Sequence, residues 1–134
     1  MRNRGSIVTI TEGKVALIER MKNGDHYYVF PGGGIKKTET PEQTAIREAF
    51  EELGVTVKID RFIDDFFFNG RQYFFQATIL SGEFGKGEGE EMTHPDPEKG
   101  SYRPVWMNLS ELLHLDVRPH EIAKEIYSWN RKRG

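Results

Sequence analysis

One short segment of the sequence carries both the start and the end signals of a helix. Thr40 is suited to cap the first turn, Pro41 fits the first helical position, and Gln43 completes a capping box with Thr40. Gly54 is a typical helix stop. Three consecutive glycines, Gly32 to Gly34, come before the predicted helix. The sequence therefore predicts a glycine-rich approach to a helix with well-defined ends.

The predicted helix has an apolar face and an acidic face, because its side chains turn by about 100° per residue. The apolar stripe consists of Ile46, Ala49, Phe50 and Leu53. Glu48, Glu51 and Glu52 point to nearly the opposite side. These like charges repel each other by a few tenths of a kcal/mol per pair, roughly, unless a cation lies between them. Oxygen ligands, in a chain without cysteine, favour Mg²⁺ or Mn²⁺ over zinc.

A solvated helix surface is the simpler explanation of the same residues. Acidic side chains are mostly exposed in proteins. Arg47, four residues before Glu51, could likewise form only a surface ion pair. The spacing of the complete segment argues against this explanation.

The segment Gly33 to Val55 resembles the sequence signature of the Nudix hydrolases. Five positions separate Gly33 from Glu39, and seven more lead to Arg47. All the fixed identities of the signature are present, and they are Gly33, Glu39, Arg47, Glu48, Glu51, Glu52 and Gly54. The two apolar positions hold Val55 and Ala49, which is smaller than the usual aliphatic residue there. A match of this length is far more specific than a lone glycine motif.

The resemblance implies an α/β fold, namely the Nudix α/β/α sandwich with a mixed β-sheet. We expect residues 1–134 to form one domain, since the length suits a single core. The resemblance also implies Mg²⁺-dependent cleavage of a nucleoside diphosphate linked to another moiety, with Mn²⁺ as the alternative ion. A non-catalytic Nudix domain that senses a nucleotide is the competing hypothesis, but it predicts loss of acids from the signature, and none is missing.

The same resemblance assigns roles within the segment. Glu51 and Glu52 are expected as metal ligands, and Glu48 as a third ligand or as the base that activates water. Arg47 would orient the glutamates, and the backbone at Gly33 is expected to add a ligand. Glu39, one of the fixed identities of the signature, is expected to hold the loop.

Four residues are candidates for substrate binding. Arg20 ends a predicted strand near the glycines and could hold a phosphate, or it could be a surface arginine. Gly34 would let the backbone approach a phosphate closely. Glu90 and Glu91 stand where some relatives place a further metal ligand or base, although a solvated loop explains them equally well.

Turn signals predict the strands around the signature. Glu12-Gly13 and Asn69-Gly70 each separate two β-rich runs and predict hairpins. Residues 21–26 are expected to form a polar loop. Phe66, Phe68 and Tyr73 could form a stacking platform for a base on one face of the second hairpin, or they could belong to the core. These aromatic residues all lie in the runs joined by Asn69-Gly70.

The last third of the chain is expected to contain a lid, a strand and a helix. The glycine, acid and proline segment from Gly82 to Gly100 has no periodicity, and we expect few packed contacts there. A final helix is predicted after a strand near Tyr102, because Ile122, Ile126 and Trp129 repeat at helical spacing.

Composition limits the partners. The formal net charge of -2 gives no electrostatic footprint for nucleic acid or an anionic membrane, so we expect a nucleotide-type small molecule instead. No apolar run is long enough to span a bilayer, and the cytoplasm is the expected location. The sequence leaves a homodimer open. It also leaves the substrate open among nucleoside triphosphates, oxidised nucleotides and dinucleoside polyphosphates.

Overall fold

The computed structural model describes residues 2–89 and 98–133, with side chains as far as Trp129. Two α-helices, nine strands and one 3-10 helix occur in this part of the chain. In chain order they are β1 (Arg4–Val8), β2 (Ile10–Thr11), β3 (Lys14–Lys22), β4 (Asp25–Val29), β5 (Gly32–Gly34), α1 (Pro41–Leu53), β6 (Val55–Phe67), β7 (Arg71–Gly82), β8 (Ser101–Asn108), η1 (Leu109–Glu111), β9 (Val117–Arg118) and α3 (His120–Arg133).

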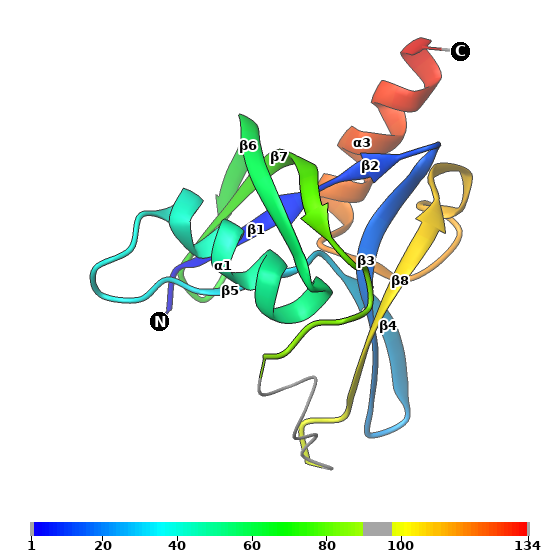
Figure 1. Cartoon of the computed structure of the whole chain (residues 1–134). Coiled ribbons are helices and arrows are strands. Elements are labelled where there is room, and N and C mark those ends of the chain that lie inside the picture. Colours follow the sequence, from blue (N-terminus) through cyan, green and yellow to red (C-terminus); the bar gives the residue numbers. More distant parts are fainter. Residues whose placement is uncertain (1, 90–97, 134) are drawn as a thin grey trace.

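The strands form two mixed sheets that lie between the helices (Figure 1). The first sheet has the order β5-β1-β7-β6, with β1 and β7 parallel. The second has the order β2-β3-β4-β9, with β8 paired to β3 and with β4 and β9 parallel. The strand β5, which holds the glycines, is therefore at an edge of the first sheet.

Neighbouring residues of one strand enter different cores. Ile7 packs in the cluster that includes α1, whereas Val8 packs in the cluster that includes α3. Phe75 and Phe74 are divided in the same way. This alternation buries both faces of the first sheet. The predicted α/β/α arrangement is thus confirmed, with the mixed sheet divided into two.

Both predicted hairpins are present. Their turns place Glu12 and Gly13 at φ values of 53° and 76°, and Asn69 and Gly70 at 53° and 114°. The expectation of a polar loop at residues 21–26 is wrong. Asn23 and Gly24 form a third tight turn at φ values of 51° and 79°, and β3 and β4 pair right up to it.

Helix α1 begins and ends where the sequence predicts. The Gln43 N–H donates to the Thr40 hydroxyl, and the Thr40 N–H donates to the Gln43 side chain, which makes the capping box. Gly54 adopts a left-handed conformation with φ of 79°, and its N–H donates to the Phe50 carbonyl.

The buried face of α1 differs from the predicted one. Its buried residues are Thr44, Ala45, Ala49, Glu52 and Leu53. Phe50 is 52% exposed, whereas Glu52 is only 6% exposed. The cause is the close approach of α1 to β1, where a side chain at Gly5 would lie 2.5 Å from the Pro41 carbonyl oxygen. Small residues therefore fill this interface, and the large ring turns outward.

This corrected face predicts unequal effects from two alanine substitutions. Leu53→Ala should lower the free energy of unfolding by about 2 to 5 kcal/mol, because Leu53 is fully buried. Phe50→Ala should lower it by about 1 kcal/mol or less, since half of the ring is already in water. Urea unfolding followed by circular dichroism checks both values. Equal losses would mean that the helix is turned differently.

The segment after β7, expected to be a lid, packs against the end of α1. The N–H groups of Gly85 and Gly89 donate to carbonyl oxygens of the last helical turn at 2.9 and 2.8 Å. Phe84 stacks on Trp106 with ring centroids 4.6 Å apart. The expectation of few packed contacts is therefore wrong for residues 83–89.

The final helix α3 follows the predicted spacing. Ile122 and Ile126 are buried in one core cluster, and Trp129 packs against that cluster. In residues 2–89 and 98–133, neither helix has the length and apolar character needed to cross a membrane.

Candidate active site

The polar side of α1 lies against the edge strand β5. Gly32 donates its N–H to Glu52 Oε1 at 2.7 Å, and the Gly34 carbonyl accepts from Arg47 Nη2 at 3.1 Å. An edge strand would otherwise leave these backbone groups without partners. Buried Glu52 thus joins the helix to the sheet, and this explains why it is not on the exposed face.

Arg47 is the centre of a carboxylate cluster. Its Nε donates to Glu39 at 2.6 Å, and its Nη1 donates to Glu51 at 2.9 Å and to Glu48 at 3.1 Å. The Arg47 side chain is 22% exposed, so these contacts are only partly screened by water. Hydrogen bonds, above all to Glu39, raise the pKa of Arg47 further above its ordinary value. The cluster therefore fixes the loop before α1, which carries Glu39, against the helix.

Glu39 has a structural role in this cluster. Its carboxylate accepts hydrogen bonds from the Lys36 N–H at 3.0 Å, the Thr44 hydroxyl at 2.8 Å and the Arg47 guanidinium. The hydrogen bond from Arg47 is the main reason that the pKa of Glu39 falls to about 2. These contacts agree with the expected part of Glu39 in holding the loop.

Glu39 should make the stability of the protein depend on pH in acid. Because its folded pKa of about 2 lies below the ordinary 4.5, its contribution is complete above about pH 4.5 and is lost as the pH falls toward 2. Wild type and Glu39→Gln should differ by up to about 3 kcal/mol in the free energy of unfolding at neutral pH, and this difference should shrink in acid. Urea titrations across this range measure it. A difference that does not change with pH would contradict the assignment.

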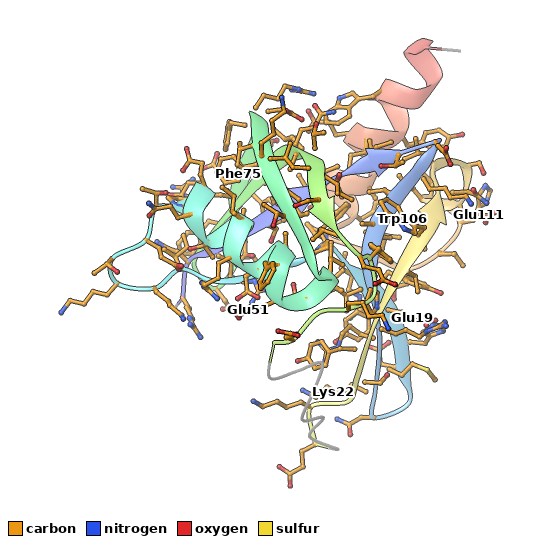
Figure 2. All side chains as sticks on the ribbon, viewed as in Figure 1. Glu19, Lys22, Glu51, Phe75, Trp106 and Glu111 are labelled. Atoms are coloured by element: carbon orange, nitrogen blue, oxygen red, sulfur yellow. The ribbon has the colours of Figure 1, made fainter. Side chains whose placement is uncertain are left out.

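The acidic face has the right chemistry for a hard cation. Figure 2 shows Glu51 and Phe75 on opposite sides of α1, so Glu51 points away from the core beneath the helix, whereas Glu52 is buried against β5. Glu39, Glu48, Glu51 and Glu52 with Arg47 are four carboxylates and one guanidinium, a formal charge of -3. The carboxylates offer oxygen atoms as metal ligands, and Mg²⁺ and Mn²⁺ prefer oxygen ligands.

The predicted ligands are neighbours, but they do not form a ready metal site. Within the described residues, no three acidic or histidine side chains converge in a metal-binding group. Glu51 directs both carboxylate oxygens to Arg47. At Gly33 an added side chain would occupy the place of the Glu48 carboxylate, so glycine is needed for this contact. A bound cation would share Glu51 with Arg47 or displace that contact.

A cleft of about 740 Å³ lies between the two sheets and the start of α3. This volume is in the range of small-molecule sites. Its lining includes basic, aromatic and amide side chains from six strands. Among the lining residues are Arg2, Arg4, Arg20, Tyr27, Phe66, Phe67, Phe68, Arg118 and Glu121. Arg4 and Ser6 face the cleft, while Gly5 between them faces α1. The cleft and the helix are therefore on opposite sides of β1.

The predicted substrate residues are placed unevenly. Arg20 lines the cleft, but two of its donors bind the carbonyls of Ser101 and Lys99 and its guanidinium lies over Tyr102. Gly34 faces Arg2 and does not line the cleft. Glu90 and Glu91 lie outside the described residues.

The predicted aromatic platform is only partly correct. Phe66 and Phe68 line the cleft, and Phe66 stacks on Phe74 with centroids 5.7 Å apart. Tyr73 packs in the core cluster on the other face of the sheet. The pairing of β6 with β7 explains the difference. Phe66 lies opposite Gln72, and Tyr73 is the next residue along β7, so its side chain is on the other face.

The sequence did not predict a role for the arginines at the start of the chain, Arg2 and Arg4. Arg2 and Arg4 line the cleft from β1 and the residues before it. The Arg4 Nη2 donates to the Gly32 carbonyl at 3.3 Å. Their spacing could have indicated that they act together, because residues two apart in an extended chain have side chains on the same face.

Comparison with known proteins gives a family model, described as the NUDIX domain, that matches residues 1–129. The chain is also similar to the RNA pyrophosphohydrolase of Vibrio atlanticus (strain LGP32), with 43% identity over 56 residues. That match spans 42% of this chain and 31% of the relative, so less than a third of the relative is covered.

Solved structures share the fold at low identity. A NUDIX hydrolase from Nitrosomonas europaea superposes with a TM-score of 0.71 at 18% identity, covering 96% of this chain and 89% of that one. MutT, known from Aliivibrio salmonicida and Vibrio cholerae, gives a TM-score of 0.67 at 18% identity and covers 96% and 99%. At these identities the likeness concerns the fold.

Proposed function

The chain belongs to the Nudix family, and we propose that it hydrolyses a phosphoric anhydride bond of a nucleotide derivative in a Mg²⁺-dependent reaction. The observation that carries this proposal is the Arg47-centred cluster, in which Glu39, Glu48 and Glu51 meet one guanidinium while Glu52 binds the edge strand. Every acid of the Nudix signature takes part in this arrangement.

Glu48, Glu51 and Glu52 would hold the divalent cation, together with a backbone oxygen near Gly33. Mg²⁺ bound there would neutralise charge on the phosphates and lower the pKa of a bound water. Mn²⁺ would serve in the same place, since it prefers the same oxygen donors.

The protein groups position this chemistry. Arg47 fixes Glu51 and Glu48 relative to the strand, and the Gly32 N–H holds Glu52 at 2.7 Å. Glu48 lies against the backbone of Gly33 and is either a ligand or the base that takes a proton from the attacking water. The water gives a proton to the base and its oxygen attacks one phosphorus, the bond from that phosphorus to the bridging anhydride oxygen breaks, and the other phosphate leaves with the bridging oxygen.

A substrate panel tests the proposal. Purified protein is incubated with Mg²⁺ and with nucleoside triphosphates, oxidised nucleotides, dinucleoside polyphosphates, ADP-ribose and 5′-triphosphorylated oligonucleotides, and the products are separated by chromatography. At least one compound should be split at its anhydride, and excess chelator should stop the reaction until Mg²⁺ or Mn²⁺ is restored. Tight binding of a nucleotide without cleavage would favour a sensor domain instead. Full activity in excess chelator would contradict metal dependence.

A further inference from the structure

The cleft across β1 from the carboxylates carries an excess of positive charge. Arg2, Arg4 and Arg20 line it, and in the described part of the chain none of the three has a carboxylate within ion-pair distance. Glu121 is the one acid among its described lining residues. This concentration of charge is local, because the whole chain has a formal charge of -2.

Arg118, a fourth lining arginine, does not add to this excess. Its guanidinium is paired with Asp116 at 2.8 Å and with Asp25 at 3.1 Å, and it lies 4.0 Å from the centroid of Tyr27. Arg20 approaches the same tyrosine at 5.9 Å. Arg118 therefore supports the wall at Tyr27, and the positive charge that no carboxylate neutralises comes from the other three arginines.

The end of β6 supplies an aromatic surface to the same cleft. Phe67 and Phe68 are 61% and 68% exposed, and Phe66 is backed by Phe74 in a nearly parallel stack. Large apolar rings are usually covered in a folded protein. Rings exposed beside arginines suit a ligand that has both an aromatic base and anionic groups.

The arginines lie directly against the strand that contacts the acidic face of α1. Arg4 binds the Gly32 carbonyl, and Gly32 donates its N–H to Glu52. The Arg2 guanidinium lies where a side chain at Gly34 would be, and the Gly34 carbonyl binds Arg47. The lining of the cleft and the acidic side of α1 therefore meet at the same edge strand, β5.

We propose that the cleft binds a phosphoryl group of the substrate that is separate from the anhydride, next to a stacked base. This inference rests on the proposed function and narrows its substrate class to nucleotides with a further phosphate, as a ribose phosphate monoester or as the phosphodiester of a following nucleotide. Arg2 and Arg4 hold this phosphate, because they are the arginines of the cleft lining that lie against β5, and Arg20 adds positive charge to the cleft.

Binding of unreactive ligands tests this directly. Calorimetry at fixed salt and Mg²⁺ compares adenosine 5′-monophosphate, adenosine 3′,5′-bisphosphate and the dinucleotide pApA, with the guanosine series measured in parallel because the base is not specified. The extra phosphate should strengthen binding at least about tenfold. Tightening by the bisphosphate alone identifies a monoester, and tightening by the dinucleotide identifies a diester. Either result supports the proposal.

Variants assign the effect to the arginines. Arg2→Ala and Arg4→Ala should each reduce the preference for the extra phosphate to about twofold or less, with little change for the monophosphate. Arg103→Ala is the matched control, since it removes one exposed arginine that pairs with Glu19 and does not line the cleft. Should Arg4→Ala unfold, Arg2→Ala still decides, because Arg2 is exposed and precedes β1.

Three outcomes would overturn the proposal. They are equal affinities for the monophosphate, the bisphosphate and the dinucleotide in both series, a preference for the extra phosphate that survives both arginine variants, and no measurable binding of any ligand at millimolar concentration. None of these ligands contains an anhydride, so the result is independent of catalysis. Failure of the substrate panel, in contrast, would remove the proposed reaction and leave this binding result standing.

Discussion

Glu52→Gln should lower Mg²⁺-supported turnover by about 100-fold or more. Glutamine has the same shape, and its amide oxygen can still accept the Gly32 N–H that Glu52 binds at 2.7 Å. The variant therefore lacks the negative charge that a divalent cation requires but keeps the strand contact. The free energy of unfolding should change by about 1 kcal/mol or less, because a weaker hydrogen bond is offset by relief of repulsion between glutamates.

Glu42→Gln is the matched control for this measurement. Glu42 is an exposed glutamate in the first turn of the same helix and lies outside the Arg47 cluster. Its variant should keep wild-type turnover and lose only a few tenths of a kcal/mol, roughly, from its place at the helix N-terminus. Turnover of Glu52→Gln equal to that of Glu42→Gln would remove Glu52 from the catalytic centre.

Arg47→Ala should damage both stability and activity. It removes the cation shared by Glu39, Glu48 and Glu51 and leaves the Gly34 carbonyl without its donor. Loss of one partner from such a partly buried cluster costs about 3 kcal/mol, and for a domain of this size that corresponds to a fall of about 10 °C in Tm. Turnover should fall with it, because the glutamates lose their fixed orientation.

Arg47→Lys separates charge from geometry. Lysine restores the positive charge, but its compact ammonium has three donors and cannot reach all four groups that Arg47 binds, which are three carboxylates and the strand carbonyl. We expect a Tm between those of Arg47→Ala and wild type, with turnover still strongly reduced. Thermal melts and turnover assays on the three proteins measure both effects. A melt of Arg47→Ala within about 1 °C of wild type would contradict the central position of Arg47.

Local signals were enough to predict the helix and two hairpins. The capping box at Thr40, the stop at Gly54 and the turn at Asn69-Gly70 depend on residues close together in the chain, so tertiary packing did not change them. The same asparagine-glycine signal at Asn23-Gly24 was overlooked because polar residues surround it.

The orientation of α1 depended on contacts that helical spacing does not contain. Gly5 brings the helix so close to β1 that Ala45 and Ala49 form the interface, and this places Phe50 in solvent and Glu52 inside. The Nudix signature predicted which glutamates belong to the candidate site. In the structure these glutamates lie around Arg47 and against β5. Their roles in metal binding and catalysis remain predictions.

The cleft could not be predicted from any continuous motif. Its arginines come from the start of the chain, from β3 and from β9, and they meet only after β1 pairs with β5 and β7. Sheet register of this kind is set by long-range pairing. The sequence predicted Arg20 alone as a phosphate ligand, whereas in the structure Arg2 and Arg4 line the same cleft as Arg20.

The most direct test of the account is a Mn²⁺ titration of wild type, Glu52→Gln and Glu42→Gln, with free Mn²⁺ measured by electron paramagnetic resonance. Wild type and Glu42→Gln should bind Mn²⁺ equally, and Mg²⁺ should displace it. Glu52→Gln should bind it at least about tenfold more weakly, because one carboxylate of the acidic face is neutral. Equal Mn²⁺ binding by all three proteins would contradict the claim that the acidic face of α1 holds the catalytic cation.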